Sequence, residues 1–122
     1  MASEREIVDV FKRMEAELPG FIAASLVDLE SGMTLAVHSV RPDFDLSAAS
    51  AYNSEIVKAK SKAIRSLDLK STLEDITLTL SDQIHVIRIV TPQTFVYLAA
   101  EKAQTNLAIV RVAMGKHAPE LA

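Results

Sequence analysis

The stretch Leu18-Pro19-Gly20-Phe21-Ile22-Ala23-Ala24-Ser25-Leu26-Val27-Asp28 contains the boundary between a helix and a strand. Proline cannot continue the hydrogen-bond ladder of a helix, and glycine readily adopts the turn conformation that follows. From Phe21 to Val27 the residues are apolar or small at both alternating positions, which is typical of a strand covered on both faces. The segment therefore predicts a helix that ends near Leu18 and a central strand after it.

A first helix is predicted before this boundary. Ser3 and Glu6 have the spacing of a capping box, and apolar residues then recur at steps of three and four. These residues are Ile7, Val10, Phe11, Met14 and Leu18. After the first strand, residues 28–32 predict a turn and residues 33–38 a second strand, so the two strands form a hairpin.

A long second helix is predicted over about residues 48–67, because apolar residues keep helical spacing for about five turns. These residues are Ala48, Ala49, Tyr52, Ile56, Ala59, Ala63, Ile64 and Leu67. Small side chains allow another helix to approach closely, and this wide alanine-bearing face exceeds what one sheet can cover. We interpret Glu55, Lys58, Lys60 and Lys62 as its polar edge.

The second half of the chain predicts three strands in an antiparallel meander and a closing helix. The strands are predicted at residues 73–80, 84–90 and 94–100. The helix is predicted from Thr105, as its N-cap, to Met114, with Gly115 at its end. The predicted order is α-β-β-α-β-β-β-α, an α/β (α+β) fold in one domain over residues 1–122. Its five-stranded antiparallel sheet has helices on both faces.

The strand at 73–80 is predicted to lie at an edge of the sheet, whereas 21–27 and 94–100 are apolar on both faces and are predicted to be central. Apolar and threonine side chains alternate in the edge strand, which indicates one wetter face. Its residues are Ile76, Thr77, Leu78 and Thr79. Proline and charged residues usually prevent an edge strand from pairing with another chain, and this strand has no proline and few charges.

Composition narrows the class of protein. Of the 122 residues, 49% are hydrophobic and 24% charged, which is typical of one globular domain. The net charge is -3, and no Lys/Arg cluster follows the pattern that phosphate backbones or anionic lipids select, so we expect neither nucleic acid binding nor membrane insertion. Charges at Glu4, Arg5 and Glu6 interrupt any signal peptide, and the chain has no cysteine, so we expect a cytoplasmic protein.

No catalytic or cofactor motif is evident in the sequence. The three glycines are not clustered, whereas a phosphate-binding loop requires several close together. His38, His85 and His117 are far apart, so we interpret them as surface or edge residues rather than metal ligands. Ser25 lies inside a strand and Asp28 in a turn, where packing and local hydrogen bonds explain them. We therefore predict a protein that is not an enzyme and holds no cofactor or metal.

The element order and two segments resemble the roadblock/LC7 family, the small domains of dynein light chains, endosomal scaffolds and bacterial GTPase regulators. The segment Thr105 to Met114 is similar to the closing helix of that family, and Leu18 to Asp28 is similar to its first helix end and opening strand. One departure is that Gly32 lies four residues after Asp28, where the family often has glycine at three. This difference predicts a longer turn in the first hairpin.

The resemblance implies a homodimer in which the third strands pair edge to edge and the second helices pack side by side. The residues expected at the dimer or partner interface are Ala48, Tyr52, Glu55, Ile56, Ala59, Ile76, Thr77, Leu78 and Thr79. Tyr52 has two interpretations, an interface anchor or a core residue on its own sheet. The resemblance also implies that the dimer binds and regulates a small Ras-like GTPase by preferring one nucleotide state.

Two other functions are consistent with the sequence. A structural scaffold or light-chain-type adaptor would bind proteins without a preference for a nucleotide state. A small-molecule sensor is the second, since PAS-like and profilin-like folds also wrap helices around a five-stranded sheet. A sensor needs an apolar pocket, which 5% aromatic residues and no tryptophan make less suited to this chain. Arg41, before the second helix, is a candidate for contact with a partner.

Overall fold

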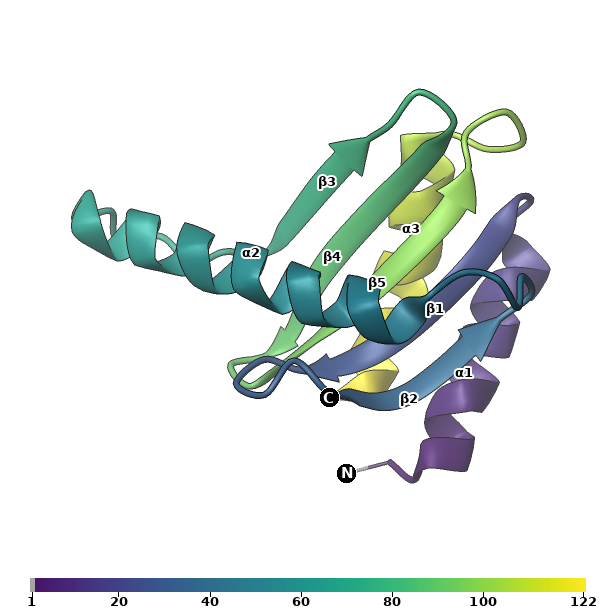
Figure 1. The fold of residues 1–122 in the computed structure, drawn as a ribbon, viewed down its shortest axis with the longest axis horizontal. Helices are drawn as coiled ribbons and strands as arrows, with labels where there is room; N and C mark the ends of the chain where they lie inside the picture. Colours follow the sequence, from purple (N-terminus) through teal and green to yellow (C-terminus); the bar gives the residue numbers. More distant parts are fainter. Residues whose placement is uncertain (1) are drawn as a thin grey trace.

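The computed structural model describes residues 2–122, which form three α-helices and five strands in the predicted order (Figure 1). The elements are α1 (Glu4–Glu17), β1 (Phe21–Asp28), β2 (Thr34–Ser39), α2 (Leu46–Ser66), β3 (Asp75–Thr79), β4 (Gln83–Thr91), β5 (Thr94–Glu101), α3 (Leu107–His117) and the short 3-10 helix η1 (Ala118–Leu121). The predicted fold class, helices around a five-stranded antiparallel sheet, is confirmed.

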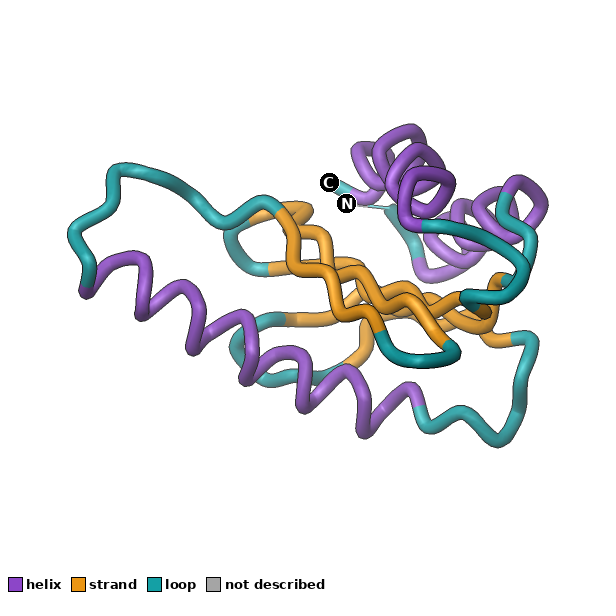
Figure 2. The backbone as a smooth tube through the Cα atoms, turned by 90° about the horizontal axis from the view of Figure 1, so that it is seen from above, coloured by secondary structure: helices purple, strands orange, loops and turns teal. Residues whose placement is uncertain are grey.

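The five strands form one sheet in the order β2-β1-β5-β4-β3, and all neighbours are antiparallel. β1 and β5 are central and β3 is an edge, as predicted, and β2 is the other edge. α2 covers one face of the sheet, and α1 and α3 cover the other, so the molecule has three layers (Figure 2).

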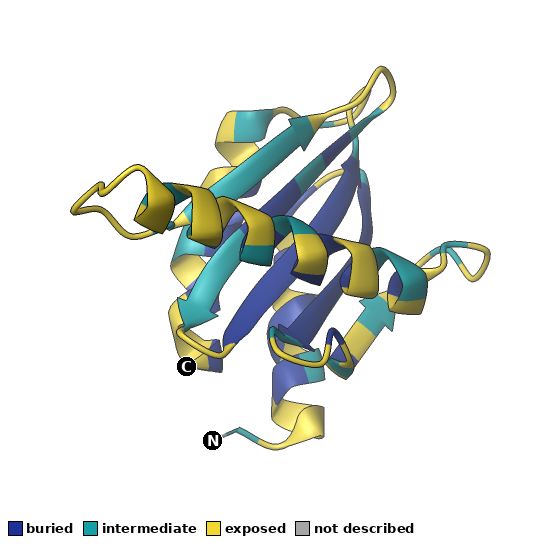
Figure 3. Ribbon diagram, turned by 60° about the vertical axis from the view of Figure 1, so that its left-hand side comes forward, coloured by how far each residue is buried: buried dark blue, intermediate teal, exposed yellow. Residues whose placement is uncertain are grey.

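The two central strands separate two apolar cores, which explains why their residues are apolar or small on both faces along most of their length. Phe11, Met14 and Leu98 belong to the core under α1 and α3. Val57 and Phe95 belong to the core under α2. The central strands are buried along most of their length, whereas much of α2 is exposed (Figure 3).

α1 begins and ends where the sequence predicts. The Ser3 hydroxyl oxygen accepts a hydrogen bond from the Glu6 N–H at 3.2 Å, and the Glu6 carboxylate accepts one from the Ser3 N–H at 3.2 Å. Gly20 has φ +80°, and a Cβ there would lie 3.0 Å from the Glu101 carbonyl oxygen. Both the backbone conformation and the close approach of β5 therefore require glycine at this turn.

The first hairpin turn is closed by its acidic residue. The Asp28 carboxylate accepts hydrogen bonds from the Ser31 N–H at 3.0 Å and from its hydroxyl at 2.6 Å. Gly32, at φ +75°, donates its N–H to the Asp28 carbonyl at 2.8 Å. The two Ser31 bonds lower the pKa of the Asp28 carboxyl. Asp28 is the last residue of β1, and its side chain makes the local hydrogen bonds of the turn, as predicted.

The ends predicted for the closing helix are wrong. The N-cap is Asn106 rather than Thr105, because the Asn106 side-chain oxygen accepts from the Ile109 N–H at 3.0 Å. α3 then continues through Gly115 to His117. A glycine inside a helix lowers the stability of the helix by about 1 kcal/mol. Burial of His117, Ala118 and Leu121, which follow Gly115, offsets this loss.

Candidate protein-binding surface

α2 buries a different face from the one that its apolar residues predict. The side chains that it buries against the sheet are Leu46, Ser50, Asn53, Ser54 and Val57. Tyr52 is 74% exposed, so the interpretation of Tyr52 as a core residue on its own sheet is wrong. The apolar spacing was a poor guide because short polar side chains form most of the contact with the sheet. None of the residues on the predicted alanine-bearing face is buried.

Two serines of α2 bond to the sheet beneath it. The Ser50 and Ser25 hydroxyl oxygens are 2.9 Å apart in a buried hydrogen bond. The Ser54 hydroxyl donates to the Leu29 carbonyl at 2.6 Å. Ser25 is thus a buried residue of a strand, as predicted, and its partner on α2 is a contact that the sequence did not indicate.

A polar chain continues from α2 across the sheet. The Asn53 side chain lies near the Tyr97 hydroxyl, and that hydroxyl bonds to Nδ1 of His85 at 3.1 Å. Nε2 of His85 lies 2.7 Å from the Gln83 side-chain oxygen, so Nε2 carries the ring proton. Burial raises the pKa of Tyr97 to about 12, and burial also lowers the pKa of His85. Both groups are therefore neutral at neutral pH.

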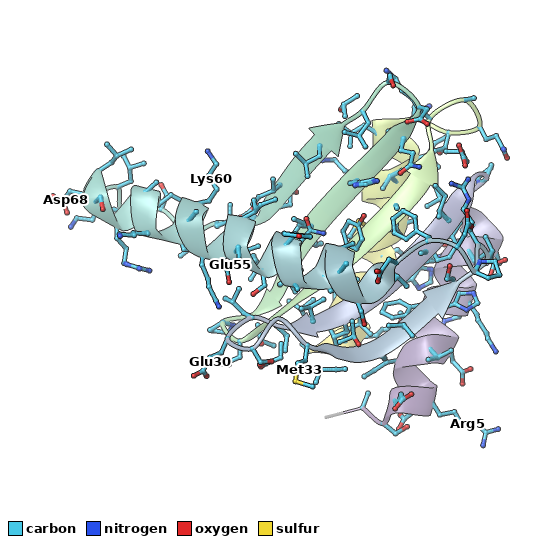
Figure 4. All side chains as sticks on the ribbon, viewed as in Figure 1. Arg5, Glu30, Met33, Glu55, Lys60 and Asp68 are labelled. Atoms are coloured by element: carbon cyan, nitrogen blue, oxygen red, sulfur yellow. The ribbon has the colours of Figure 1, made fainter. Side chains whose placement is uncertain are left out.

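The exposed sides of α2 differ from one another in chemistry. Successive helical residues are about 100° apart, so Ile56 and Lys58 lie on opposite flanks of Val57, which faces the sheet. The Lys58 ammonium donates to the Glu30 carbonyl at 2.8 Å, which places that flank beside the β1–β2 turn. Lys60 shares the flank of Ile56, and Figure 4 shows it pointing to the side of β3. We call these two sides the Lys58 flank and the Ile56 flank.

The Ile56 flank is mainly apolar. Residues recur along it at steps of three and four, namely Ala49, Tyr52, Ile56, Lys60, Ala63 and Leu67. Three of the nine residues predicted at the interface, Ala48, Glu55 and Ala59, lie on the side of α2 turned away from the sheet, and Tyr52 lies between that side and Ile56. Only the carboxylate of Glu55 has an ion-pair partner among these residues, the Lys58 ammonium at 3.6 Å.

The second half of α2 extends past the sheet. The last residue that it buries is Val57, and no residue from 58 to 66 is buried. Figure 1 shows this half projecting beyond the start of β3. At 21 residues the helix is roughly 31 Å long. Leu67, just after it, is 69% exposed. The helix is therefore longer than its own sheet requires.

β3 has β4 on one side and an open backbone edge on the other. The Leu80 N–H donates to Gln83 and the Ile89 N–H donates to Glu74, both at 2.9 Å. In an antiparallel pair of strands, residues whose backbone groups bond to the neighbouring strand alternate with residues whose backbone groups point away from it. These two bonds therefore fix which residues of β3 point away from β4. The residues that present these groups to the open edge are Asp75, Thr77 and Thr79.

The side chains of β3 divide between the two faces of the sheet. Ile76 and Leu78 lie opposite Ile87 and His85, on the face that α2 covers. Thr77 lies on the face of α1 and α3, where its hydroxyl oxygen is buried with no hydrogen-bond partner in the described part of the chain. The remaining predicted interface residue, Thr79, is exposed. None of the nine predicted interface residues is buried.

The other candidate side chains have partners within the molecule. Arg41 forms an ion pair with Glu101, which accounts for its position. His38 Nε2 lies 2.6 Å from the Glu15 carboxylate. The prediction of a surface histidine is wrong for His117, which is 5% exposed because it packs at the α1–α3 contact and bonds to Glu17 at 2.8 Å. Within residues 2–122, no three His, Asp or Glu side chains are grouped as metal ligands would be.

A cavity of about 430 Å³ lies beneath the projecting half of α2. Its lining comes from α2, from residues 71–73 before β3, and from the end of β4 and the turn after it. The sequence did not predict this cavity, since its lining residues are distant in the chain. None of the described helices is both long and apolar enough to cross a membrane.

No protein-family model matches the sequence, and no curated protein matches it. Solved structures do match. An MglB with a tetrameric arrangement is 16% identical over 100% of this chain and 89% of its own, with a TM-score of 0.87. The gliding protein MglB of Thermus thermophilus is 15% identical, with coverages of 100% and 90% and a TM-score of 0.86.

A roadblock/LC7 domain from Streptomyces avermitilis is 15% identical over 88% of both chains, with a TM-score of 0.77. These likenesses extend over most or all of the chain at low sequence identity. The resemblance that the sequence indicated is thus confirmed in three dimensions, and the chain has the roadblock/LC7 fold.

Proposed function

We propose that this chain forms a homodimer that binds and regulates a small Ras-like GTPase without taking part in catalysis. The observation that carries the proposal is the combination of an open β3 edge and a helix that projects past it. The Ile56 flank of that helix faces the same side as the open edge. A second copy of the chain would cover both features at once.

Strand pairing is the first part of the interface. If a two-fold axis passes beside Thr77, the outward groups of Asp75 meet those of Thr79 in the second copy, and Thr77 meets its own counterpart. This register uses the whole of β3 and forms roughly six backbone hydrogen bonds. Other registers leave part of the strand unpaired, so we expect the one centred on Thr77.

Helix packing is the second part. The same two-fold axis brings the Ile56 flanks of the two α2 helices side by side. Alanines at 49 and 63 permit a close approach, and Tyr52 supplies the largest exposed apolar surface on the flank. Together the two parts should bury at least ~1,600 Å² in total, as stable interfaces do.

Regulation would follow from differential binding. A dimer that binds one nucleotide state of a GTPase more tightly shifts the equilibrium of the switch loops toward that state, by no more than the difference in affinity. A structural scaffold would use the same dimer without such a difference. The nucleotide dependence of binding therefore separates the proposed regulator from a scaffold.

Two measurements test the proposal. Light scattering across a wide concentration range should give a mass near twice 13.3 kDa, and a persistent monomer would overturn the dimer. Binding should then be measured to Ras-like GTPases of the source organism, loaded with GDP or with a non-hydrolysable GTP analogue. Preference for one state supports regulation, equal binding supports a scaffold, and no binding by the intact dimer removes the GTPase from the proposal.

A further inference from the structure

Positive charge is concentrated in one part of the molecule. Residues 58–70 contain five basic side chains and one acidic side chain, a net charge of +4. These residues are Lys58, Lys60, Lys62, Arg65, Asp68 and Lys70. Because the whole chain carries -3, all remaining residues together carry -7. The projecting half of α2 and the turn after it are therefore a basic region on an otherwise acidic protein.

The basic region lies directly over the cavity of about 430 Å³. That volume lies within the usual ligand-pocket range of roughly 300–1,000 Å³. Its apolar lining comes from Leu29, Val57, Ile64, Leu73, Ile89, Val90 and Pro92. Arg65 is part of the lining, and the Ser61 and Thr72 side chains add hydroxyl groups. The cavity can thus hold an apolar side chain with a positive charge beside it.

This site is separate from the proposed dimer contact. Lys58, Lys62 and Arg65 recur at steps of four and three residues, so they share one flank, opposite Ile56. The Lys58 ammonium is already bonded to the Glu30 carbonyl. In contrast, Lys62 and Arg65 form no ion pair with any of residues 2–122. Arg65, in the cavity lining, and Lys62, on the same flank of α2, are therefore available to a ligand.

We propose that the cavity and the Lys58 flank bind an acidic segment of a partner protein. One apolar side chain of the segment enters the cavity, and neighbouring carboxylates pair with Lys62 and Arg65. For the identity of the partner this inference rests on the proposed function, because it assigns the partner's contact to the Lys58 flank, which lies opposite the Ile56 flank of the proposed dimer contact.

The lining favours a protein segment over nucleic acid or lipid. It contains no aromatic side chain on which a base could stack, whereas binding of single strands uses such side chains. Anionic membranes are recognised by clusters of about four to eight basic residues. The five basic residues of 58–70 do not form such a cluster, because Lys60 lies on the Ile56 flank, Lys58 is bonded to Glu30 and Lys70 is paired with Asp68. An apolar cavity next to two cations instead matches a short acidic sequence with one apolar anchor.

The test uses the full chain labelled with ¹⁵N and the peptide acetyl-Glu-Glu-Leu-Glu-Glu-amide. We expect amide resonances of residues 61–65 and 71–73 to shift on titration. Replacing the peptide leucine by serine should weaken binding, since the cavity is then unfilled. The peptide with lysines in place of glutamates should not bind. Shifts elsewhere, or none at millimolar peptide, would overturn the proposal.

Charge reversal provides a matched pair of variants. Lys62→Glu with Arg65→Glu should weaken peptide binding by about tenfold or more. Arg5→Glu with Lys12→Glu makes the same change of net charge on exposed positions of α1, and should alter binding less than about twofold. Equal losses in the two variants would show non-specific attraction. Tighter binding of an RNA oligonucleotide or of phosphatidylserine vesicles would replace the protein segment as ligand.

The outcome can be separated from that of the proposed function. Light scattering on the same samples reports the dimer, and the peptide titration reports the cavity. A dimer that fails to bind the peptide overturns only this inference. A monomer that binds the peptide at residues 61–65 and 71–73 supports the inference and overturns the dimer.

Discussion

The two edges of the sheet differ in what lies beyond them. β2 carries exposed apolar side chains at Leu35 and Val37, and α1 packs behind it with His38 bonded to Glu15. α1 buries its apolar side chains along most of its length on its own sheet. β3 is shorter, and the helix on its side stops burying residues at Val57, then continues past the edge. Both edges have unpaired backbone groups, and only β3 combines them with a projecting helix.

This difference shows that an unpaired strand does not by itself specify an assembly. Exposed apolar groups on β2 would allow pairing, but no helical surface beside them would set the register or orientation. In the proposed dimer, the second copy contacts both the Ile56 flank and the open backbone of β3. Because the helix contact and the strand contact must form together, they would allow only one arrangement of the two copies. The following experiments test whether the protein adopts that arrangement.

The largest effect is expected at the β3 edge itself. Leu78→Lys with Thr79→Lys should abolish the dimer, because in the register centred on Thr77 the new charge at position 78 would lie opposite Ile76 of the second copy and lose its hydration there. Thr79→Pro should do the same by removing an outward N–H while leaving the bonds to β4 intact. Val37→Lys is the matched control at β2 and should leave the mass unchanged. Circular dichroism and light scattering on all three variants are the measurements.

If the lysine pair or the proline variant is a folded dimer, β3 is not the contact. If Val37→Lys alone becomes monomeric, the two edges exchange roles and the comparison is reversed.

A smaller effect is expected at Tyr52. Tyr52→Ala should weaken dimerisation by about 1–3 kcal/mol, because an aromatic anchor would be removed from the Ile56 flank. The monomer should unfold at the same urea concentration as the unmodified chain, since the side chain is exposed in one copy. Tyr52→Phe keeps the ring and should keep the affinity. Sedimentation equilibrium gives the dissociation constants, and an unchanged constant for the alanine variant would place the contact elsewhere.

The attachment of α2 to the sheet predicts a moderate effect on stability. Ser50→Ala should lower the free energy of unfolding by about 1–2 kcal/mol, because the Ser25 hydroxyl would stay buried without its partner. Ser25→Ala with Ser50→Ala should cost less than the sum of the two single changes. Urea unfolding at low protein concentration measures all three. Strict additivity would mean that the 2.9 Å contact contributes nothing to stability.

The smallest effect is a dependence on pH through His85. Burial lowers the folded-state pKa below the ordinary value of 6.5, so the unfolded state binds the proton more readily. Stability should therefore decrease as the pH falls through that value, in a window of about pH 7 to 5 that lies above the titration of most carboxylates. His85→Gln should flatten this slope. An equal slope in the variant would assign the effect to other groups.

The sequence was sufficient for the fold and only partly so for the surface. Local chemistry determines where a helix stops, as at Gly20, and which strands are apolar on both faces. It also determines the alternation in β3. The element order, the central strands and one edge of the sheet could therefore be predicted. The buried side of α2 could not, because Ser50 and Asn53 resemble solvent-facing residues until their partners on distant strands are known. The cavity and the burial of His117 could not be predicted for the same reason, because both depend on residues that are distant in the chain.

One feature of α2 governs more than its own stability. Hydrogen bonds from short side chains hold the helix, and such bonds have preferred directions, unlike contacts between bulky apolar groups. Ser50 and Ser54 therefore define the angle at which the helix crosses the strands. In the proposed dimer, where the two α2 helices pack against each other, that angle would also influence how the two copies are oriented. Loss of a single buried hydroxyl beneath the helix would then affect the geometry of the pair as well as the stability of one copy.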